Sequence, residues 1–193
     1  MTDILLIVPL LTTPDFSTSA VNALLSPVGE SLWDAGGSVR VGHIFGHMES
    51  MEVAGFGGFG ASTSAFELGD RRFDATGATA ELEAGPRWTW SMGASRGWAE
   101  AAAGVHARFG YPDWAPAAWT LGLGGHAAGG IDFGKGKVRP RIGLESAMTI
   151  ATTSYSADVI LPDGTLSWAW NPSRLRVAVV VGVAFGAPVS GPS

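Results

Sequence analysis

The sequence predicts an all-β protein: a closed antiparallel transmembrane β-barrel of eight strands with a short N-terminal helical segment. The strongest observation is that residues 78–92 alternate apolar and polar side chains without a break. Side chains of a strand point to opposite faces in turn, so a period of two is typical of a β-strand. Soluble strands are usually about 5–6 residues long. At roughly 3.3 Å per residue this segment reaches about 50 Å, enough to cross a hydrocarbon core of about 30 Å when tilted.

The same alternation recurs in residues 99–111, 137–150 and 174–185, and in each segment the charged residues keep to one face. The polar face carries many Gly and Ala residues between its charges, whereas the other face is bulky. Small residues with paired charges fit the narrow interior of an eight-stranded barrel, so we expect the apolar face to point outward into lipid. Residues expected to face lipid include Leu82, Val105, Ile142 and Val179.

Composition supports a membrane barrel. The 193 residues are 46% hydrophobic and 15% charged, whereas about 25% charged residues is usual in soluble domains. No run of about 18 apolar residues is present, which excludes a transmembrane helix. The chain has no Cys, which excludes disulfides and thiol catalysis. Its net charge of −5 argues against nucleic acid as a partner.

Residues 1–36 are expected to form a separate segment ahead of the barrel. Residues 4–11 are apolar, but Asp3 stands where a secretory signal has its basic region, so this is a poor signal peptide. Residues 17–34 predict an amphipathic helix that ends at Gly36. Its apolar stripe is Ala20, Val21, Leu24, Leu25, Val28 and Leu32. The barrel is then expected over 37–186, and residues 187–193 form a C-terminal tail.

The eight strands are expected in order along the barrel segment. They cover 38–48, part of 52–68, 76–92, 97–111, 118–130, 137–152, part of 155–170, and 173–186. If the third and fourth strands form a hairpin with Ala94 and Ser95 at its tip, Glu81 faces Arg108 and Glu83 faces His106. A shift of two residues would instead pair Glu83 with Arg108.

Aromatic residues are expected near both membrane interfaces, because Trp and Tyr rings are apolar with one hydrogen-bonding edge. If the first strand of this set rises from the periplasmic side, the two groups separate by parity and position. The outer group is Trp88, Trp90, Trp168 and Trp170, and the inner group is Phe109, Tyr111, Trp119 and Phe185. Trp98 has inward parity and lies outside this pattern.

The positions assigned to the lumen carry a set of charged residues and one histidine. They are Arg40, Glu81, Glu83, Arg87, Glu100, His106, Arg108, Lys137, Arg139, Arg141, Glu145, Arg174 and Arg176. Eight of these are Lys or Arg and four are Glu, which predicts a basic interior and acidic loops. We expect Arg–Glu pairs around ordered water. An anion-selective passage is the alternative, although eight strands usually leave no continuous pore.

Residues with catalytic or metal-binding chemistry are few. His43 and His47 share one parity near Ser50, an arrangement that would suit an outer-leaflet lipid-modifying enzyme. His106 and His126 point inward on adjacent strands, where a satisfied hydrogen bond is favoured over a metal ligand. The glycine-rich residues 129–136 contain no phosphate-binding motif. We therefore expect no catalytic residues, no cofactor and no bound metal.

The alternation and the last strand together resemble the small outer-membrane β-barrels of the OmpA/OmpX type. The segment from Arg174 to Phe185 resembles the closing strand of that group, with Gly182 and a terminal aromatic. The resemblance covers about residues 38–186 and rests on pattern. It implies the outer membrane of a Gram-negative bacterium, with membrane lipids or lipopolysaccharide and other envelope proteins as partners.

The function expected from these observations is that of a non-enzymatic outer-membrane barrel with a charged, closed lumen. It would serve as a structural anchor or as a subunit of an envelope complex. Three alternatives stay open at this point: an outer-leaflet lipid-modifying enzyme, a small anion-selective pore, and a soluble lipid-carrying barrel with its faces inverted.

Overall fold

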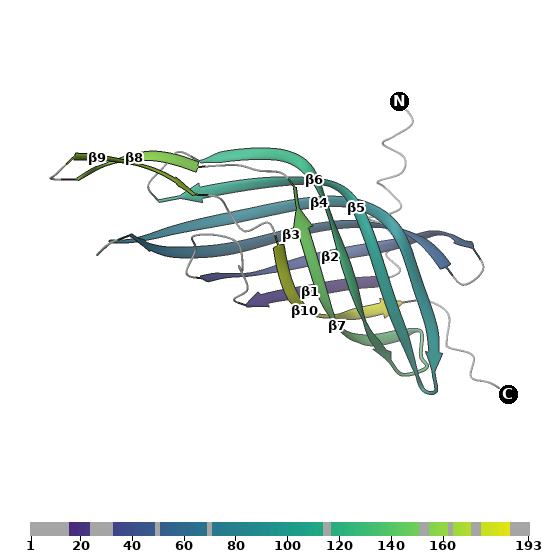
Figure 1. The fold of residues 1–193 in the computed structure, drawn as a ribbon. Helices are drawn as coiled ribbons and strands as arrows, with labels where there is room; N and C mark the ends of the chain where they lie inside the picture. The colour runs from purple at the N-terminus through teal and green to yellow at the C-terminus, as the bar shows by residue number, and fades with distance from the viewer. Residues whose placement is uncertain are drawn as a thin grey trace, which may run out of the picture.

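The computed structural model describes residues 16–23, 33–48, 51–68, 71–113, 117–150, 155–161, 164–170 and 175–185. These residues form ten strands (Figure 1). The strands are β1 (Phe16–Ala23), β2 (Trp33–Met48), β3 (Met51–Leu68), β4 (Arg71–Met92), β5 (Ser95–Pro112), β6 (Ala118–Phe133), β7 (Val138–Thr149), β8 (Tyr155–Leu161), β9 (Gly164–Trp170) and β10 (Leu175–Phe185). Across the described ranges, no helix is long and apolar enough to cross a bilayer.

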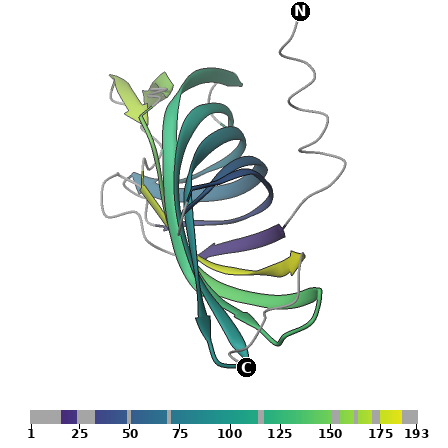
Figure 2. The same cartoon turned by 90° about the vertical axis from the view of Figure 1, so that its right-hand side faces the viewer.

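Eight of the strands close into a barrel in the order β1-β10-β7-β6-β5-β4-β3-β2. Every pairing is antiparallel, and β1 closes the ring because it pairs with β2 on one side and β10 on the other. Figure 2 looks along the curved wall that these strands make. The predicted eight-stranded antiparallel barrel is confirmed. In a closed barrel no strand edge is left unpaired, which is what spanning a lipid bilayer requires.

The eighth strand of the barrel is β1, in a region where the sequence predicted a helix. Residues Phe16–Ala23 are a strand, with Ser17 paired to both Val41 and Val183, so the helix prediction over 17–34 is wrong there. Residues 24–32 of that prediction lie outside the described residues. Pairing with two neighbouring strands overrides local periodicity, and the barrel therefore begins at Phe16 rather than at residue 37.

Residues 155–170 do not form one barrel strand as predicted. They form the hairpin β8–β9, a separate two-stranded sheet in which Tyr155 pairs with Trp170. Figure 1 shows this hairpin projecting from one end of the barrel. In the sequence, Pro162 and Asp163 stand between the two strands and Gly164 follows them, and Pro, Asp and Gly are residues that favour turns.

The β4–β5 hairpin turns one residue earlier than predicted. Met92 pairs with Ser95, so Gly93 and Ala94 form the tip, and Gly93 has a positive φ of 63°. A glycine adopts that left-handed conformation without the cost that a side chain imposes. In consequence Glu81 pairs with His106 and Thr79 with Arg108, so both predicted registers are wrong.

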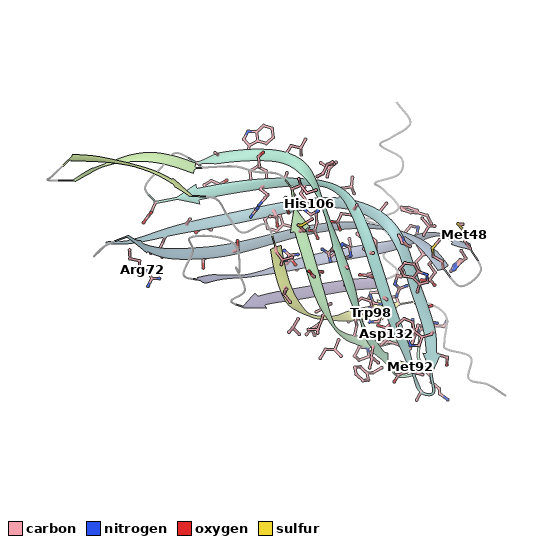
Figure 3. The ribbon with its side chains drawn as sticks, in the orientation of Figure 1. Met48, Arg72, Met92, Trp98, His106 and Asp132 are labelled. Atoms are coloured by element: carbon pink, nitrogen blue, oxygen red, sulfur yellow. The ribbon has the colours of Figure 1, made fainter. Side chains whose placement is uncertain are left out.

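The two ends of the barrel differ in their connections. At one end, which we call the short-turn end, lie Phe16, Phe185 and the connections β2–β3, β4–β5 and β6–β7. At the other, the loop end, lie the connections β1–β2, β3–β4 and β5–β6, and the long one from β7 to β10 that contains β8–β9. In Figure 3, Met48 and Met92 mark the short-turn end and Arg72 marks the loop end.

The outer face is apolar, as predicted. Leu82, Val105, Ile142 and Val179 are 45–48% exposed, which confirms that this face points away from the interior. Aromatic residues lie toward both ends of the wall, but their grouping differs from the prediction. Trp88, Trp90 and Phe185 lie toward the short-turn end, whereas Phe109, Tyr111 and Trp119 lie toward the loop end.

The predicted grouping of the aromatics is therefore wrong in two respects. Phe185 shares an end with Trp88 and Trp90, and β9, with Trp168 and Trp170, belongs to a hairpin outside the barrel wall. The cause is the strand count, because a missed first strand and a split seventh strand reverse the direction assigned to the strands.

Candidate functional site

The barrel interior is filled by charged side chains. Strand alternation places Glu81, Glu83 and Arg87 of β4 on the inner face, and all of them are buried. A buried charge is costly unless an opposite charge and hydrogen bonds compensate it. The described interior meets this requirement through three groups of contacts.

The first group, which we call the arginine cluster, consists of Arg40, Glu81, Glu145 and Arg176. Nε of Arg40 donates to Oε1 of Glu81 over 2.7 Å, and the same guanidinium also pairs with Glu145. Nη2 of Arg176 donates to the other oxygen of Glu145 over 2.7 Å. These contacts connect β2, β4, β7 and β10 across the lumen, including strands that are not neighbours in the sheet.

The second group, the histidine cluster, is built around Glu83. One oxygen of Glu83 lies 2.7 Å from Nε2 of His106, and the other oxygen contacts Nδ1 of His126. Nδ1 of His106 lies 2.9 Å from Oγ1 of Thr149. The rings of Phe56 and His126 are nearly perpendicular, with centroids 4.9 Å apart. A single carboxylate thus lies between two buried imidazoles.

The third group closes the short-turn end. Arg141 donates two hydrogen bonds to Asp132, from Nε over 2.7 Å and from Nη2 over 3.1 Å. Its guanidinium carbon lies 4.4 Å from the centroid of the Trp98 ring. Trp98 and Asp132 are fully buried, and Figure 3 shows their labels side by side near this end. A two-pronged ion pair stacked on an aromatic ring is among the stronger polar arrangements in proteins.

Arg87 and Arg139 complete this third group. Nη1 of Arg87 donates to Glu52 over 2.7 Å, and its Nε lies 3.4 Å from Glu100. Nη1 of Arg139 donates to the backbone oxygen of Gly136 over 2.8 Å, so this arginine is tied to the β6–β7 connection. Together the third group places guanidinium, carboxylate and indole groups across the section of lumen at the short-turn end.

The structure places the predicted lumen residues unevenly. The buried ones are Arg40, Glu81, Glu83, Arg87, Glu100, His106, Arg139, Arg141 and Glu145. Arg108 and Arg176 are half-buried. Lys137 is exposed in the β6–β7 connection rather than in the interior, because β7 begins one residue later, at Val138. Arg174 lies outside the described residues.

The predicted set lacks several interior residues, among them the polar or indole-bearing Glu52, Trp98, His126 and Asp132. Trp98 and His126 already had inward parity, but neither carries a permanent charge. Asp132 lies two residues beyond the predicted end of its strand, and Glu52 begins a strand whose glycines blur the alternation. Counting these residues and the half-buried Arg96, which pairs with Asp132, the described interior holds seven guanidinium groups and six carboxylates. The excess of basic groups is therefore one, against the predicted four.

His43 and His47 do not share a face as predicted. A β-bulge between Ile44 and Gly46 inserts an extra residue, which reverses the side to which the following residues point. His43 packs its ring against Phe45 at 5.2 Å. His47 has a side chain 71% exposed and lies 3.8 Å from the interior residue Glu52. Ser50 lies outside the described residues.

Comparison with known proteins addresses the fold. No family model matches the chain, and no curated protein matches its sequence. Among solved structures, Neisserial surface protein A (NspA) matches with a TM-score of 0.50 at 10% identity, over 88% of this chain and 94% of NspA. Ail, the attachment invasion locus protein of Yersinia pestis, in complex with the heparin analogue sucrose octasulfate, matches with a TM-score of 0.43 at 12% identity, over 88% and 94%.

NspA and Ail are small eight-stranded outer-membrane β-barrel proteins. This chain has the fold of NspA. The predicted resemblance to barrels of the OmpA/OmpX type is confirmed at the level of architecture, and the similarity to NspA extends over nearly the whole length of both chains.

Proposed function

We propose that this chain is a non-enzymatic integral protein of a bacterial outer membrane, whose barrel anchors the loop-end segments at the cell surface. It would act there as a structural anchor or as a subunit of an envelope complex. The observation that carries the proposal is the contrast between the two faces of one wall. Bulky apolar side chains are exposed outside, and charged groups are buried and paired inside.

The exposed outer face supports placement in a bilayer rather than in water. Large apolar residues such as Leu123, Leu144 and Val181 are more than half exposed. A monomeric soluble protein rarely exposes a contiguous apolar surface of this extent. A soluble lipid-carrying barrel would have the opposite arrangement, with apolar side chains lining its cavity. Membrane lipids or lipopolysaccharide are the partners that this face fits.

The connections support one orientation. Barrels of bacterial outer membranes have short periplasmic turns and longer extracellular loops. By this rule the short-turn end, where β1 begins at Phe16 and β10 ends at Phe185, faces the periplasm. The loop end then carries the β8–β9 hairpin and the far part of the β3–β4 hairpin outside the cell. These segments are where other envelope proteins would bind.

The filled lumen supports a closed barrel rather than an anion passage. Phe56, Trp98 and Arg141 are fully or almost fully buried in the interior, and the described guanidinium groups exceed the carboxylates by only one. A selective anion pore needs water and an excess of positive charge along its path. The position of His43 and His47 near the short-turn end also separates them from the outer leaflet, where a lipid-modifying enzyme of that type would act.

Single cysteine variants can test the membrane placement, because the chain has no native Cys. Val179 is exposed and its neighbour Ala178 is buried, so Val179→Cys and Ala178→Cys form a matched pair. With a nitroxide label in phospholipid vesicles, we expect label 179 to collide with dissolved oxygen as a lipid-facing site does. Label 178 should be protected, and equal oxygen accessibility at the two sites would contradict the proposal.

Electrical recording tests the closed lumen. The purified barrel in a planar bilayer should show no stepwise conductance at neutral pH. Sustained current steps with preference for chloride would support the anion-passage alternative, and the spin-label result would then still decide whether the barrel spans the membrane.

A further inference from the structure

One part of the lumen has donor chemistry that an anchoring role does not use. Glu81, Glu83 and His106 each offer a ligand atom, and these atoms all lie within 4.8 Å of one another. All three side chains are buried. The strand register creates the group, because Glu81 of β4 pairs directly with His106 of β5 and Glu83 is the next inward residue on β4.

Each of the three side chains contacts a further residue, which lies on a different strand in each case. Nδ1 of His106 lies 2.9 Å from Oγ1 of Thr149 on β7. Arg40 of β2 contacts Oε1 of Glu81, which leaves the second oxygen of that carboxylate for another partner. His126 of β6 contacts Glu83. Metal-binding histidines almost always bond through their other ring nitrogen to a fixed group, and ligating carboxylates are similarly supported.

Two glycines make room for this group. A Cβ built on Gly58 would collide with the Glu81 carboxylate, and one built on Gly124 would collide with the His106 ring. Neither glycine has a positive φ, so the backbone conformation does not require glycine at either position. The space is therefore kept open for the side chains of Glu81 and His106.

The polar groups around the cluster are incompletely satisfied. Nε2 of His126 is fully buried and has no hydrogen-bond partner among the described residues. Its distance of 3.6 Å from Oε1 of Glu100 is too long for a hydrogen bond. The contacts described for Glu83 are with imidazoles alone, and Arg40 divides its positive charge between Glu81 and Glu145. The two carboxylates of the site are thus matched by less than one full guanidinium charge.

We propose that Glu81, Glu83 and His106 bind a divalent transition-metal ion of the zinc type inside the barrel. An imidazole nitrogen with carboxylate oxygens and no sulfur is a donor set that zinc accepts, with bonds of about 2.0–2.2 Å. Calcium and magnesium prefer oxygen donors alone. The ion replaces the direct contact between Glu83 and His106 and links β4 to β5 at mid-barrel. This inference is independent of the anchoring function.

Zinc stoichiometry on the intact chain provides the first test. The refolded barrel in detergent is stripped with a chelator, dialysed against zinc chloride and analysed for bound metal by mass spectrometry. We expect a single tightly bound ion per chain, which His106→Gln and Glu83→Gln should each lose. The control His47→Gln changes an exposed histidine and should retain the ion.

A graded variant separates a positioning role from a ligand role. Thr149→Val keeps the shape of the side chain but removes the hydroxyl that holds His106. It should weaken zinc affinity about 10–100-fold without abolishing binding, as loss of an outer-shell partner does. The heat-dependent shift in gel migration, which depends on a folded barrel, shows for each variant whether folding is retained.

A measurement on the unaltered chain keeps the proposal testable if the lumen variants do not fold. X-ray absorption of the zinc-loaded protein should show one imidazole and several oxygen neighbours around the metal. A wild-type barrel that binds no more zinc than His106→Gln would overturn the proposal. So would a first shell with two or more imidazoles, which the proposed ligand set does not provide.

Discussion

The two faces of β4 obey different rules although their residues alternate along one strand. Leu82 is 48% exposed on the outer face, whereas Glu81 and Glu83 on either side of it are almost fully buried. The outer residue needs only to be apolar. Each inner residue needs a specific partner side chain. Glu81 depends on Arg40 from β2, and Glu83 depends on the imidazoles of His106 from β5 and His126 from β6.

This difference shows which positions of the barrel wall tolerate substitution and which require one particular residue. Many apolar side chains can replace Leu82 without leaving anything unpaired. A substitution at an inner position leaves a charged side chain on another β-strand buried without its partner. The substitution then costs as much free energy as burying an uncompensated charge. We therefore expect the inner face to dominate the effects of substitution, and the following variants test that expectation from the largest effect to the smallest.

Arg141→Ala should be among the most damaging single changes. It leaves the Asp132 carboxylate fully buried without its two-pronged partner and removes the cation stacked on Trp98. Breaking a buried pair from one side costs about 3–5 kcal/mol of unfolding free energy. Urea unfolding in lipid vesicles, followed by circular dichroism, measures it. The control Arg72→Ala removes a pair with Asp74 that is more than half exposed, and it should cost at most about 1 kcal/mol.

Leu82→Arg tests the outer face. Leu82 lies near the middle of β4, so an arginine there would be placed in the hydrocarbon at about its midplane. The expected cost is about 2–4 kcal/mol in vesicles, against about 0–1 kcal/mol for Met92→Arg beside the short turn. Equal costs at the two depths would mean that the wall does not face a bilayer.

The long alternating segments predicted the wall of the barrel and the direction of its faces. Residues 78–92 form most of β4 with every charge on one parity, and burial follows that parity from Glu81 to Ala84 and from Arg87 to Trp90. The prediction of which segments form the barrel strands was wrong at two places. Phe16–Ala23 does not alternate apolar and polar residues, and its strand is fixed by pairing with β2 and β10. In residues 155–170 a Pro-Asp-Gly turn signal was present, and it marks where β8 ends and β9 begins.

The candidate site could be predicted only in part, for a related reason. Parity placed Glu81, Glu83 and His106 on the inner face, but which of them meet depends on the register. Moving the hairpin tip to Gly93 changed the partner of Glu81 from Arg108 to His106. Contacts across the lumen, such as Arg40 with Glu145, connect strands far apart in the chain, and no local pattern contains them.

Gly93→Ala tests the β4–β5 turn, where a residue faces neither the lumen nor the lipid and only the backbone conformation matters. The positive φ of Gly93 forces an L-residue into the left-handed region, which costs roughly 1–2 kcal/mol. Gly46→Ala is the matched control, because its Cβ would meet nothing within 4 Å and its φ is not positive. We expect a lower urea midpoint for Gly93→Ala alone. An unchanged midpoint would show that the turn accommodates a side chain and that another feature sets the β4–β5 register.

Trp98→Phe should have the smallest effect on stability. It tests whether an uncharged inner residue also needs a specific polar partner. Nε1 of Trp98 has no hydrogen-bond partner among the described residues, so phenylalanine removes no hydrogen bond. It keeps an aromatic face for Arg141, although a weaker one, and the expected loss is about 1 kcal/mol or less. Trp98→Ala removes the face entirely and leaves a cavity, for about 3–5 kcal/mol. Thermal unfolding followed by gel migration compares the two. If phenylalanine proved as damaging as alanine, the indole N–H would have a partner in the lumen, and Trp98 would belong to the polar network rather than support it through its ring.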